Sequence, residues 1–356
     1  MTIADIPPLR LSNQEINPPE FTNPSELVKW LGAVQAQDFN AAKWALGLRM
    51  PGITDADIER AFNIGNILRT HIMRPTWHFV APEDIKWITE LTAPRVKAQC
   101  AFMNRKMELD EAIFKKCNKI IIKALTGHKY LTRSALGVVL QKAGVAVDEF
   151  RLMCIVMRAE LDAIICSGPR VGKQFTYALL EERAPKSKIL KPEGALAELT
   201  KRYFVSHGPA TLQDFIWWSG LTTTDAKMGV ETVKLQKEII DGQIYWYADS
   251  MNLQKNTSGI YLLPIFDEYI IAYKDRTAVF DGHKFGKVIQ RGNMISNNTI
   301  IENGKVTGTW KRTLMKDKVV VEPITFIKPT KARKLSIAEA ADNYGEFLGL
   351  NAVLKW

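Results

Sequence analysis

The sequence lacks the features that would assign it to a membrane or secreted protein. No segment reaches about 18 consecutive uncharged apolar residues, so no membrane-spanning helix is predicted. The start, MTIADIPP, has no basic region followed by an apolar stretch, so we expect no signal peptide. We therefore expect a cytoplasmic protein with no membrane partner, associated with the nucleoid if it binds DNA.

Cysteine is scarce, and its spacing argues against a metal or disulfide framework. The chain has four cysteines and no CxxC pair: Cys100, Cys117, Cys154 and Cys166. This pattern favours buried reduced thiols over disulfides or zinc ligands. His71 and His78 flank a predicted turn, with no cysteine or acidic partner at ligand spacing. We expect no metal and no cofactor.

The charge of the chain is unbalanced toward the basic side. At 356 residues the chain is long enough for two or three domains, and its formal net charge is +10. Residues 1–60 carry a net −3, whereas residues 304–334 hold nine basic residues against two acidic ones, a net +7. A solvated surface explains any single basic run. A polyanion becomes the better explanation where basic residues fall on a DNA-binding motif.

Residues 106–190 show the clearest such motif. Apolar spacing and caps predict helices over 109–125, 133–142 and 149–162. Residues 163–167 and 174–178 then read as two strands joined by a glycine-bounded loop. Three helices and a hairpin predict a winged helix. Arg170 and Lys173 lie at the predicted wing tip, where phosphate contacts are expected.

Residues 191–255 repeat the pattern. A helix is predicted over 195–207, and Thr211, with Asp214 three residues later, caps another over 212–218. Ser219-Gly220-Leu221 is the predicted turn, followed by a helix to about Ile240 and a strand over 243–247. Trp217-Trp218 could stack on bases, but adjacent tryptophans at a helix end are more typical of a core residue and its lid.

Residues 1–105 form the first predicted unit. Helices are expected over 24–35, 41–50 and 54–63, and a hairpin of 66–73 and 76–80 crosses Arg74-Pro75. Five polar residues of this hairpin are candidate DNA contacts: Arg69, His71, Arg74, Thr76 and His78. A hydrogen-bonded polar surface is an equally good explanation for them.

The C-terminal residues 256–356 are rich in β signals. Strands are expected within 261–273 and over 298–302, 306–312 and 319–326, with the hairpin signal Asn303-Gly304 between two of them. A small β-barrel or half-barrel closed by a helix over 337–348 is predicted. Lys311 and Arg312 lie in its basic run and are candidate DNA contacts. Asp267 and Glu268 would face opposite ways in a strand, which argues against a catalytic carboxylate pair.

The triplet Gln35-Ala36-Gln37 is the candidate active site. A glutamine stays neutral, so it is no general base, but its amide can fix a water or stabilise a developing charge. Residues i and i+2 point about 200° apart on a helix, so the two amides converge only if the helix breaks at Gln35. Asp38 is a suitable cap for a following helix. Two surface glutamines that are adjacent by chance are the alternative.

Five segments together resemble the AlkZ-type DNA glycosylases of the tandem winged-helix family, related to the YcaQ-like proteins. They are VQAQD at 34–38, RPTWH at 74–78, GPATLQDFIWWSGL at 208–221, LPIFDEY at 263–269 and NGKVTGTW at 303–310. The resemblance implies an α+β fold of three tandem winged helices in a C-shaped arrangement, with a C-terminal β-structure. It also implies that Gln35 and Gln37 are catalytic. The YcaQ-like branch has aspartate at the second position of this Gln-apolar-Gln motif, so Gln37 resembles the AlkZ side of the family. Two departures from the family are Pro75, where glycine is common, and a short wing in the middle unit.

The resemblance implies a monofunctional glycosylase that hydrolyses the glycosidic bond of N7-alkylated purines in double-stranded DNA. Such a base is already cationic, so two neutral amides that position water would suffice. Unhooking of interstrand crosslinks is a further hypothesis, and we expect a monomer. A non-enzymatic winged-helix regulator explains the charge and the three units equally well, and a small-molecule enzyme using the polar hairpin is a third hypothesis.

Overall fold

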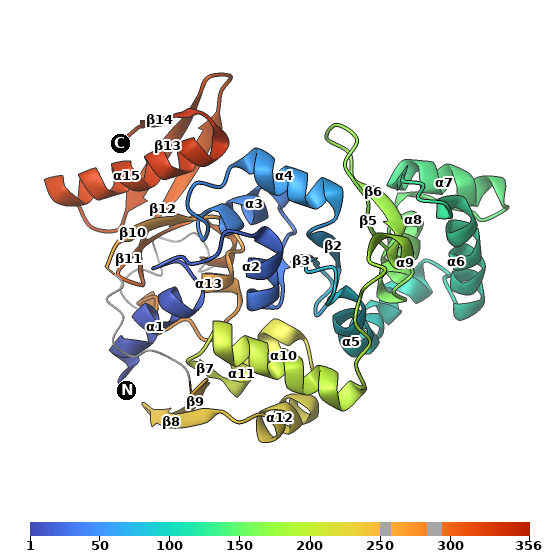
Figure 1. Cartoon of the computed structure of the whole chain (residues 1–356), viewed down its shortest axis with the longest axis horizontal. Coiled ribbons are helices and arrows are strands. Elements are labelled where there is room, and N and C mark those ends of the chain that lie inside the picture. The colour runs from blue at the N-terminus through green and yellow to red at the C-terminus, as the bar shows by residue number, and fades with distance from the viewer. Residues whose placement is uncertain (250–257, 283–293) are drawn as a thin grey trace.

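The computed structural model describes residues 1–249, 258–282 and 294–356. It is a mixed α and β structure with four small sheets (Figure 1). In this view the unit of residues 106–190 lies on the right and the third unit at the bottom. The C-terminal strands lie on the left, where both chain ends are also found. Among the described residues, no helix is both long enough and apolar enough to cross a membrane.

The first unit contains five helices and three strands after a short 3-10 turn at Ile3–Asp5. Its elements are α1 (Ile6–Asn13), α2 (Pro24–Leu31), β1 (Val34–Gln35), α3 (Phe39–Gly47), α4 (Asp55–Ile64), β2 (Leu68–His71), β3 (Trp77–Val80) and α5 (Ile85–Lys106). The predicted caps are confirmed, since Asp38 accepts from the Ala41 amide and Thr54 forms a capping box with Asp57. The helix predicted over 24–35 ends four residues early, at Leu31.

The second and third units follow the same order of elements. The second consists of α6 (Glu111–Leu125), β4 (Leu131–Thr132), α7 (Arg133–Lys142), α8 (Glu149–Leu161), β5 (Ile165–Ser167), β6 (Thr176–Leu179) and α9 (Leu180–Arg183). The third consists of α10 (Pro192–Ser206), β7 (Ala210–Thr211), α11 (Leu212–Ser219), α12 (Thr223–Thr232), β8 (Gln236–Ile240) and β9 (Gln243–Tyr247). The helix predicted to reach Ile240 is wrong in its last turns, because residues 236–240 pair with β9 instead.

Strand order is the same in all three units. Each sheet has three strands, in the orders β1-β3-β2, β4-β6-β5 and β7-β9-β8. In each, a short strand placed before or between the helices pairs with the last strand of a hairpin. The chain therefore repeats one topology three times.

The C-terminal part is a curled five-stranded half-barrel. Its elements are β10 (Ile260–Leu263), α13 (Glu268–Ile271), a 3-10 turn at Met294–Ser296, β11 (Thr299–Glu302), β12 (Lys305–Leu314), β13 (Lys318–Thr325), α15 (Lys331–Leu348) and β14 (Asn351–Leu354). Asn303 and Gly304 have φ values of 50° and 81°, as the predicted tight hairpin turn requires. The strand expected within 261–273 ends at Leu263, and α13 replaces its second half.

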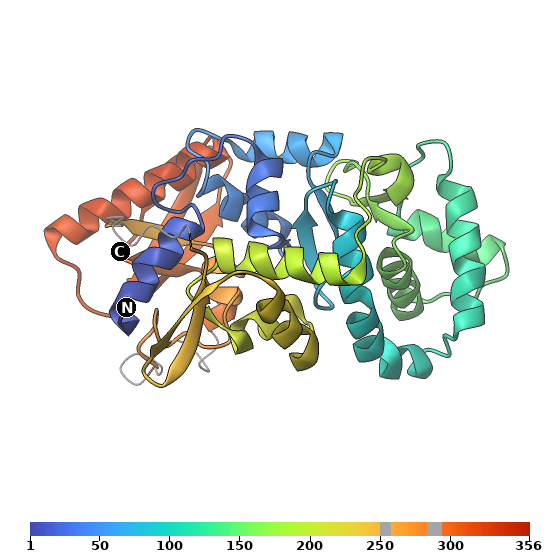
Figure 2. The same ribbon diagram turned by 60° about the horizontal axis from the view of Figure 1, so that its bottom comes forward.

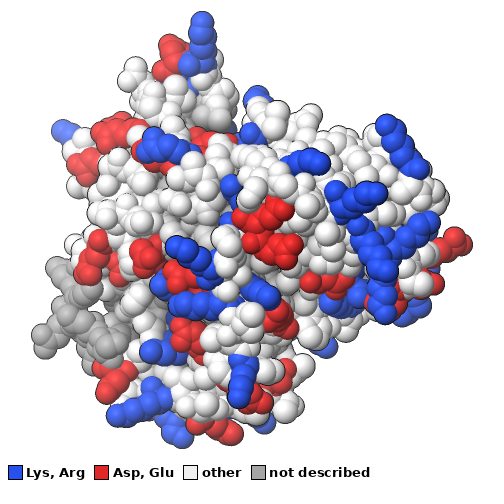
Figure 3. All heavy atoms as spheres, turned by 45° about the vertical axis from the view of Figure 1, so that its right-hand side comes forward, with Lys and Arg blue, Asp and Glu red and all other residues white. Residues whose placement is uncertain are grey.

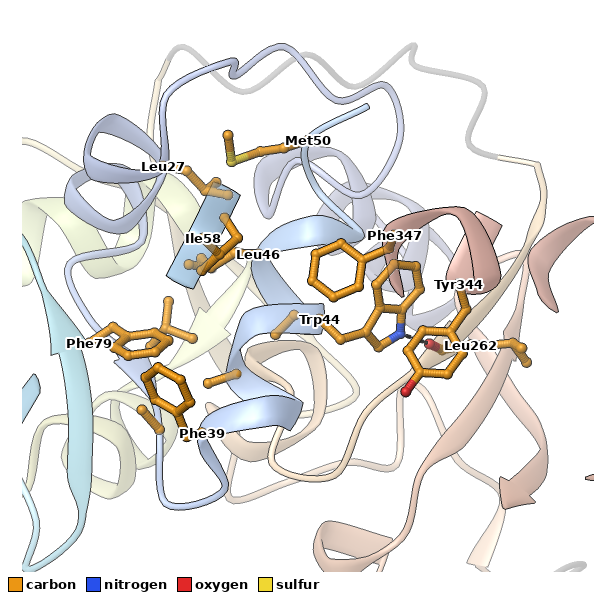
Figure 4. Close-up of a cluster of buried hydrophobic side chains, with 14 of the residues drawn as sticks. Leu27, Phe39, Trp44, Leu46, Met50, Ile58, Phe79, Leu262, Tyr344 and Phe347 are labelled. Atoms are coloured by element: carbon orange, nitrogen blue, oxygen red, sulfur yellow. Dashed lines mark hydrogen bonds between the residues drawn. The ribbon is translucent and has the colours of Figure 1, made fainter. Parts of the chain in front are cut away.

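The first unit and the half-barrel share one hydrophobic core. Trp44 of α3 packs against Tyr344 and Phe347 of α15, with ring centroids 4.9 and 5.1 Å apart (Figure 4). Its indole donates to the Leu262 carbonyl of β10 at 2.7 Å. Gly47 is required beneath this cluster, since a Cβ there would lie 2.4 Å from the Phe347 ring. The half-barrel is therefore an integral support of the first unit, and Figure 2 shows the two side by side from a second direction.

A buried arginine connects three segments at the centre of this region. Arg49, 1% exposed, donates to both carboxylate oxygens of Asp267 at 2.8 Å. It also donates to the Ala45 carbonyl and to the backbone and side-chain oxygens of Gln14. All five guanidinium N–H groups are thereby used. This network holds the start of α13 against α3 and the end of α1.

Replacing this arginine tests how strongly the half-barrel is anchored. Arg49→Met removes one partner of a buried ion pair and leaves the Asp267 carboxylate without compensation, so we expect a loss of about 3–5 kcal/mol in the free energy of unfolding. Urea unfolding measures it. The matched control is Lys355→Ala, which breaks the solvent-screened pair with Glu322 and should leave the free energy of unfolding almost unchanged. Equal costs for the two variants would contradict this account.

Candidate active site

The Gln35-Ala36-Gln37 triplet is extended rather than helical. Helix α2 ends at Leu31, and Gly32 follows with φ +77°, where a Cβ would lie 3.2 Å from the Trp218 ring. Strand β1 then pairs with β3, placing Gln35 opposite His78. The Ala36 amide continues this pairing by donating to the Trp77 carbonyl at 2.7 Å. The predicted break of the helix is confirmed, although it lies four residues before Gln35.

Strand β1 ends at Gln35 and Gln37 lies in a bend, but the alternation of buried and polar side chains continues through the triplet. Side chains i and i+2 of a strand share a face, whereas on a helix they diverge. Val34 and Ala36 are buried in the core that the first unit shares with the half-barrel. Gln35 and Gln37 therefore point the other way. Gln35 is 6% exposed and Gln37 is exposed, so the pair lies partly in the wall of the site and partly at its surface.

The hydrogen bonds determine how each amide is oriented. The Gln35 Oε1 atom accepts from Arg74 Nη2 at 2.7 Å, and the Gln37 Oε1 atom accepts from the Trp77 amide at 3.3 Å. Both partners can only donate, so an oxygen must face each of them. In the part of the chain that the structure describes, neither Nε2 group donates to a protein acceptor. Each amide therefore offers a free NH₂ group and one remaining oxygen lone pair.

Arg74 and His78 lie beside Gln35, and the Arg74 guanidinium donates to its side-chain oxygen. Arg74 also lies 3.5 Å from His78 Nε2 and 3.4 Å from the Trp217 carbonyl, with its guanidinium 5.9 Å from the Trp217 ring. The His78 Nδ1 atom donates to the Thr76 carbonyl at 3.0 Å, which leaves Nε2 as the acceptor facing Arg74. Burial, and then the charge of Arg74, hold the pKa of His78 well below its ordinary value. The site is built from neutral groups around one enclosed cation, whose pKa burial also lowers.

A buried carboxylate supports the triplet from behind. The Glu268 Oε1 atom accepts from the backbone N–H of Gln35 at 2.8 Å, and Oε2 accepts from Trp218 Nε1 at 3.0 Å. His207 Nε2 lies 3.6 Å from the same Oε2 atom. Glu268 is fully buried at the start of α13, and Asp267 caps that helix while binding Arg49. The assumption of a strand here was wrong, and both acids have structural partners.

Two further hairpin candidates, Arg69 and His71, lie on the opposite face of the hairpin. Arg69 and His71 alternate with Thr70, so they share the face of Trp77 and point toward the second unit. His71 Nδ1 lies 2.6 Å from Glu160 Oε2, and its ring packs against Trp77 in a tilted arrangement with the centroids 4.3 Å apart. The five hairpin residues that the sequence grouped together therefore belong to two different faces.

Of the DNA contacts predicted outside the hairpin, two bind other groups of the protein and two are exposed to solvent. Arg170 pairs with Glu59 at 2.9 Å and is partly buried, so it joins the second unit to the first. Arg312 donates to the Tyr344 hydroxyl. Lys173 and Lys311 are exposed. Trp218 is fully buried whereas Trp217 is 37% exposed, which matches the prediction of a core residue and its lid.

The acidic support of the triplet was missed from the sequence. Glu268 stands in the quoted LPIFDEY segment, which supplied the only signal that could have identified it. Among the described residues, no group of three or more His, Cys, Asp or Glu side chains is placed to hold a metal ion.

Protonation of His78 can be followed directly. Because the pKa of His78 is lower in the folded chain, only the unfolded chain takes up its proton as the pH falls past about 6.5. The contribution of His78 to the free energy of unfolding is therefore fully present above that pH and declines below it. Ring-nitrogen NMR spectra recorded as the pH is lowered should show His78 taking up its proton well below pH 6.5. Titration of His78 at or above pH 6.5 would contradict the described geometry.

Comparisons with known proteins identify the family of this chain. The family model "DNA glycosylase AlkZ-like" matches residues 28–347. An interstrand DNA cross-link repair glycosylase of Streptomyces sahachiroi is 24% identical over 359 residues, covering 93% of this chain and 94% of that protein. The solved structure of Streptomyces sahachiroi DNA glycosylase AlkZ superposes with a TM-score of 0.83 at 19% identity, covering all of both chains. The match over most of the length confirms the predicted family: this chain belongs to the AlkZ-like DNA glycosylases.

Proposed function

We propose that the chain hydrolyses the N-glycosidic bond of N7-alkylated purines in double-stranded DNA, with Gln35 and Gln37 as its catalytic residues. The observation that carries this proposal is the placement of two neutral amides on one face, each with its oxygen anchored and its NH₂ group free. The name of the Streptomyces relative supports a role in crosslink repair, and we extend the proposal to unhooking of interstrand crosslinks. We also propose that the three repeated units are winged helices in a C-shaped arrangement.

The chemistry needs little from the protein beyond positioning. A water oxygen bonds to the sugar carbon C1′ while the bond from C1′ to the purine N9 breaks. The electron pair of that bond neutralises the positive charge of the alkylated ring, and the water proton is released to solvent. Because the leaving group requires no protonation, no acid is needed. Two preorganised amides can hold the water and stabilise the sugar cation that develops.

The charged groups around the triplet are placed to hold Gln35 in position. Arg74 and Glu268 contact Gln35 from two sides, at its side-chain oxygen and its backbone amide. Fixing the side chain in this way lowers the cost of ordering it during the reaction. We propose that Arg74 and His78 act through Gln35, whereas the exposed Lys173 and Lys311 contact DNA phosphates.

The catalytic proposal predicts the effect of removing either amide. Gln35→Ala and Gln37→Ala should each lower the single-turnover rate of base release by about 10²–10³, as for other amide donors in enzymes. The substrate is a duplex containing 7-methylguanine, and the released base is quantified chromatographically. The exposed Gln243→Ala is the matched control and should keep the wild-type rate. Undiminished release by Gln37→Ala, or no release by the wild type, would overturn the proposal.

The support from Glu268 predicts a second, separable effect. In Glu268→Gln only one side-chain oxygen remains for two donors. Either the backbone N–H of Gln35 or the Trp218 indole therefore loses its acceptor. A displaced triplet should lower base release at saturating enzyme by about 10- to 100-fold. The dissociation constant for undamaged duplex should stay constant, because Glu268 is fully buried. The surface variant Glu322→Gln is the control, and a change in affinity alone would refute the positioning role.

A further inference from the structure

A second polar site lies across the hairpin from the glutamine pair. It is a cavity of about 390 Å³ between β2–β3, the start of α7 and the β5–β6 loop. Its basic lining residues are Arg69, Arg133 and Lys173, and no carboxylate is among the residues that line it. Trp77 joins the two sites, because its indole lines the cavity while its backbone amide donates to Gln37. We call this cavity the Arg69 pocket.

Arg69 is a buried cation without an acidic partner in the described residues. It is 8% exposed, and its guanidinium lies between the rings of Trp77 and Phe175, 4.3 and 4.5 Å from their centroids. Its one side-chain hydrogen bond is from Nε to the Ala36 carbonyl at 3.0 Å. Burial lowers the pKa of Arg69 to about 10. Among the described residues, the four N–H donors of Nη1 and Nη2 have no protein acceptor, and Glu160 acts on the charge only from beyond ion-pair distance. An anion in the pocket would compensate the buried charge.

The wall of the Arg69 pocket opposite Arg69 carries further groups of a kind that binds anions. Helix α7 has ten residues and begins at the pocket, where Thr132 accepts from the Ala135 amide. The amides of Arg133 and Ser134 precede it in the first turn, where intrahelical partners are lacking. The Arg133 side chain is 42% exposed, and its pair with Glu149 is long, at 3.8 Å. Lys173 is exposed on the β5–β6 loop.

The charge on one face of the molecule is mixed in sign. Figure 3 shows one face of the molecule, on which Lys and Arg side chains are widely spread and gather toward its right-hand edge. Acidic side chains lie between them, so the face is not uniformly positive. The Arg69 pocket differs from this mixed surface because its lining carries three cations and no acid.

We propose that the Arg69 pocket binds one backbone phosphodiester of the DNA strand whose damaged nucleotide lies at Gln35 and Gln37. The proposal rests on the proposed function for the identity of the strand. Guanidinium groups and helix amides suit phosphate, and phosphate contacts set the register of a protein on DNA. Trp77 connects this register to the glutamines. It lines the pocket, and its backbone N–H donates to the Gln37 side chain. The pocket fixes which nucleotide reaches the two amides.

Salt-dependent binding of undamaged duplex tests the pocket without any catalytic readout. Arg133→Ala and Lys173→Ala should each lower the slope of log affinity against log salt by about 0.9, the value for one phosphate. Over one decade of salt, the affinity of each variant should therefore fall by about eightfold less than the affinity of the wild type. Lys142→Ala, at the other end of α7 and equally exposed, is the matched control and should bind as the wild type does. Fluorescence anisotropy with a labelled duplex measures all four proteins.

Phosphate ethylation interference locates the contact. One ethylated position should weaken wild-type binding and lose its effect in Arg133→Ala. If both pocket variants keep the wild-type slope and interference pattern, the inference is wrong while the glycosylase proposal stands. If the slope falls but the wild type releases no base, the pocket stands and the glycosylase proposal fails. Inorganic phosphate, added at matched ionic strength, should compete only weakly. If millimolar phosphate displaces the duplex through this pocket, it is a small-anion site and the inference is overturned.

Discussion

The adjacent acids Asp267 and Glu268 are the constraint on which the site depends. Two fully buried carboxylates are costly unless each is paired or hydrogen-bonded, and here each has a separate set of partners. Asp267 binds both nitrogens at the end of the Arg49 guanidinium, which joins the half-barrel to α3. Glu268 accepts from the Gln35 amide and the Trp218 indole, which joins the triplet to the third unit. One dipeptide thereby connects the strand that carries Gln35 to the third unit and α3 to the half-barrel.

The hairpin β2–β3 separates two tasks by the alternation of its side chains. One face presents His78 and, from the adjoining turn, Arg74 to the glutamines. The other presents Arg69, His71 and Trp77 to the second unit, with Arg69 in the basic pocket. Under the proposed function, the enclosed charge of Arg74 positions a glutamine, whereas the basic residues of the Arg69 pocket bind a phosphate. This arrangement suits a reaction in which the leaving group is already activated and the substrate is a polyanion.

Local signals in the sequence predicted much of the fold. Caps such as Thr54 with Asp57, and the Asn303-Gly304 turn, act over three or four residues and were read correctly. Elements that depend on distant partners were missed. Residues 236–240 have no strong strand pattern and become a strand only by pairing with β9, and α13 forms where Asp267 meets Arg49. The glutamine pair could be named from the sequence, but its shared face depends on β1 pairing with β3, which periodicity did not reveal.

The central claim is that Gln35 and Gln37 act together on one water, and a double variant tests it most directly. Residues that act as a unit are strongly non-additive. Base release from a 7-methylguanine duplex should therefore fall in Gln35→Ala/Gln37→Ala by about as much as in the more damaging single variant. Multiplication of the two single losses would show that the amides act independently. Release at the wild-type rate by the double variant would contradict the account altogether.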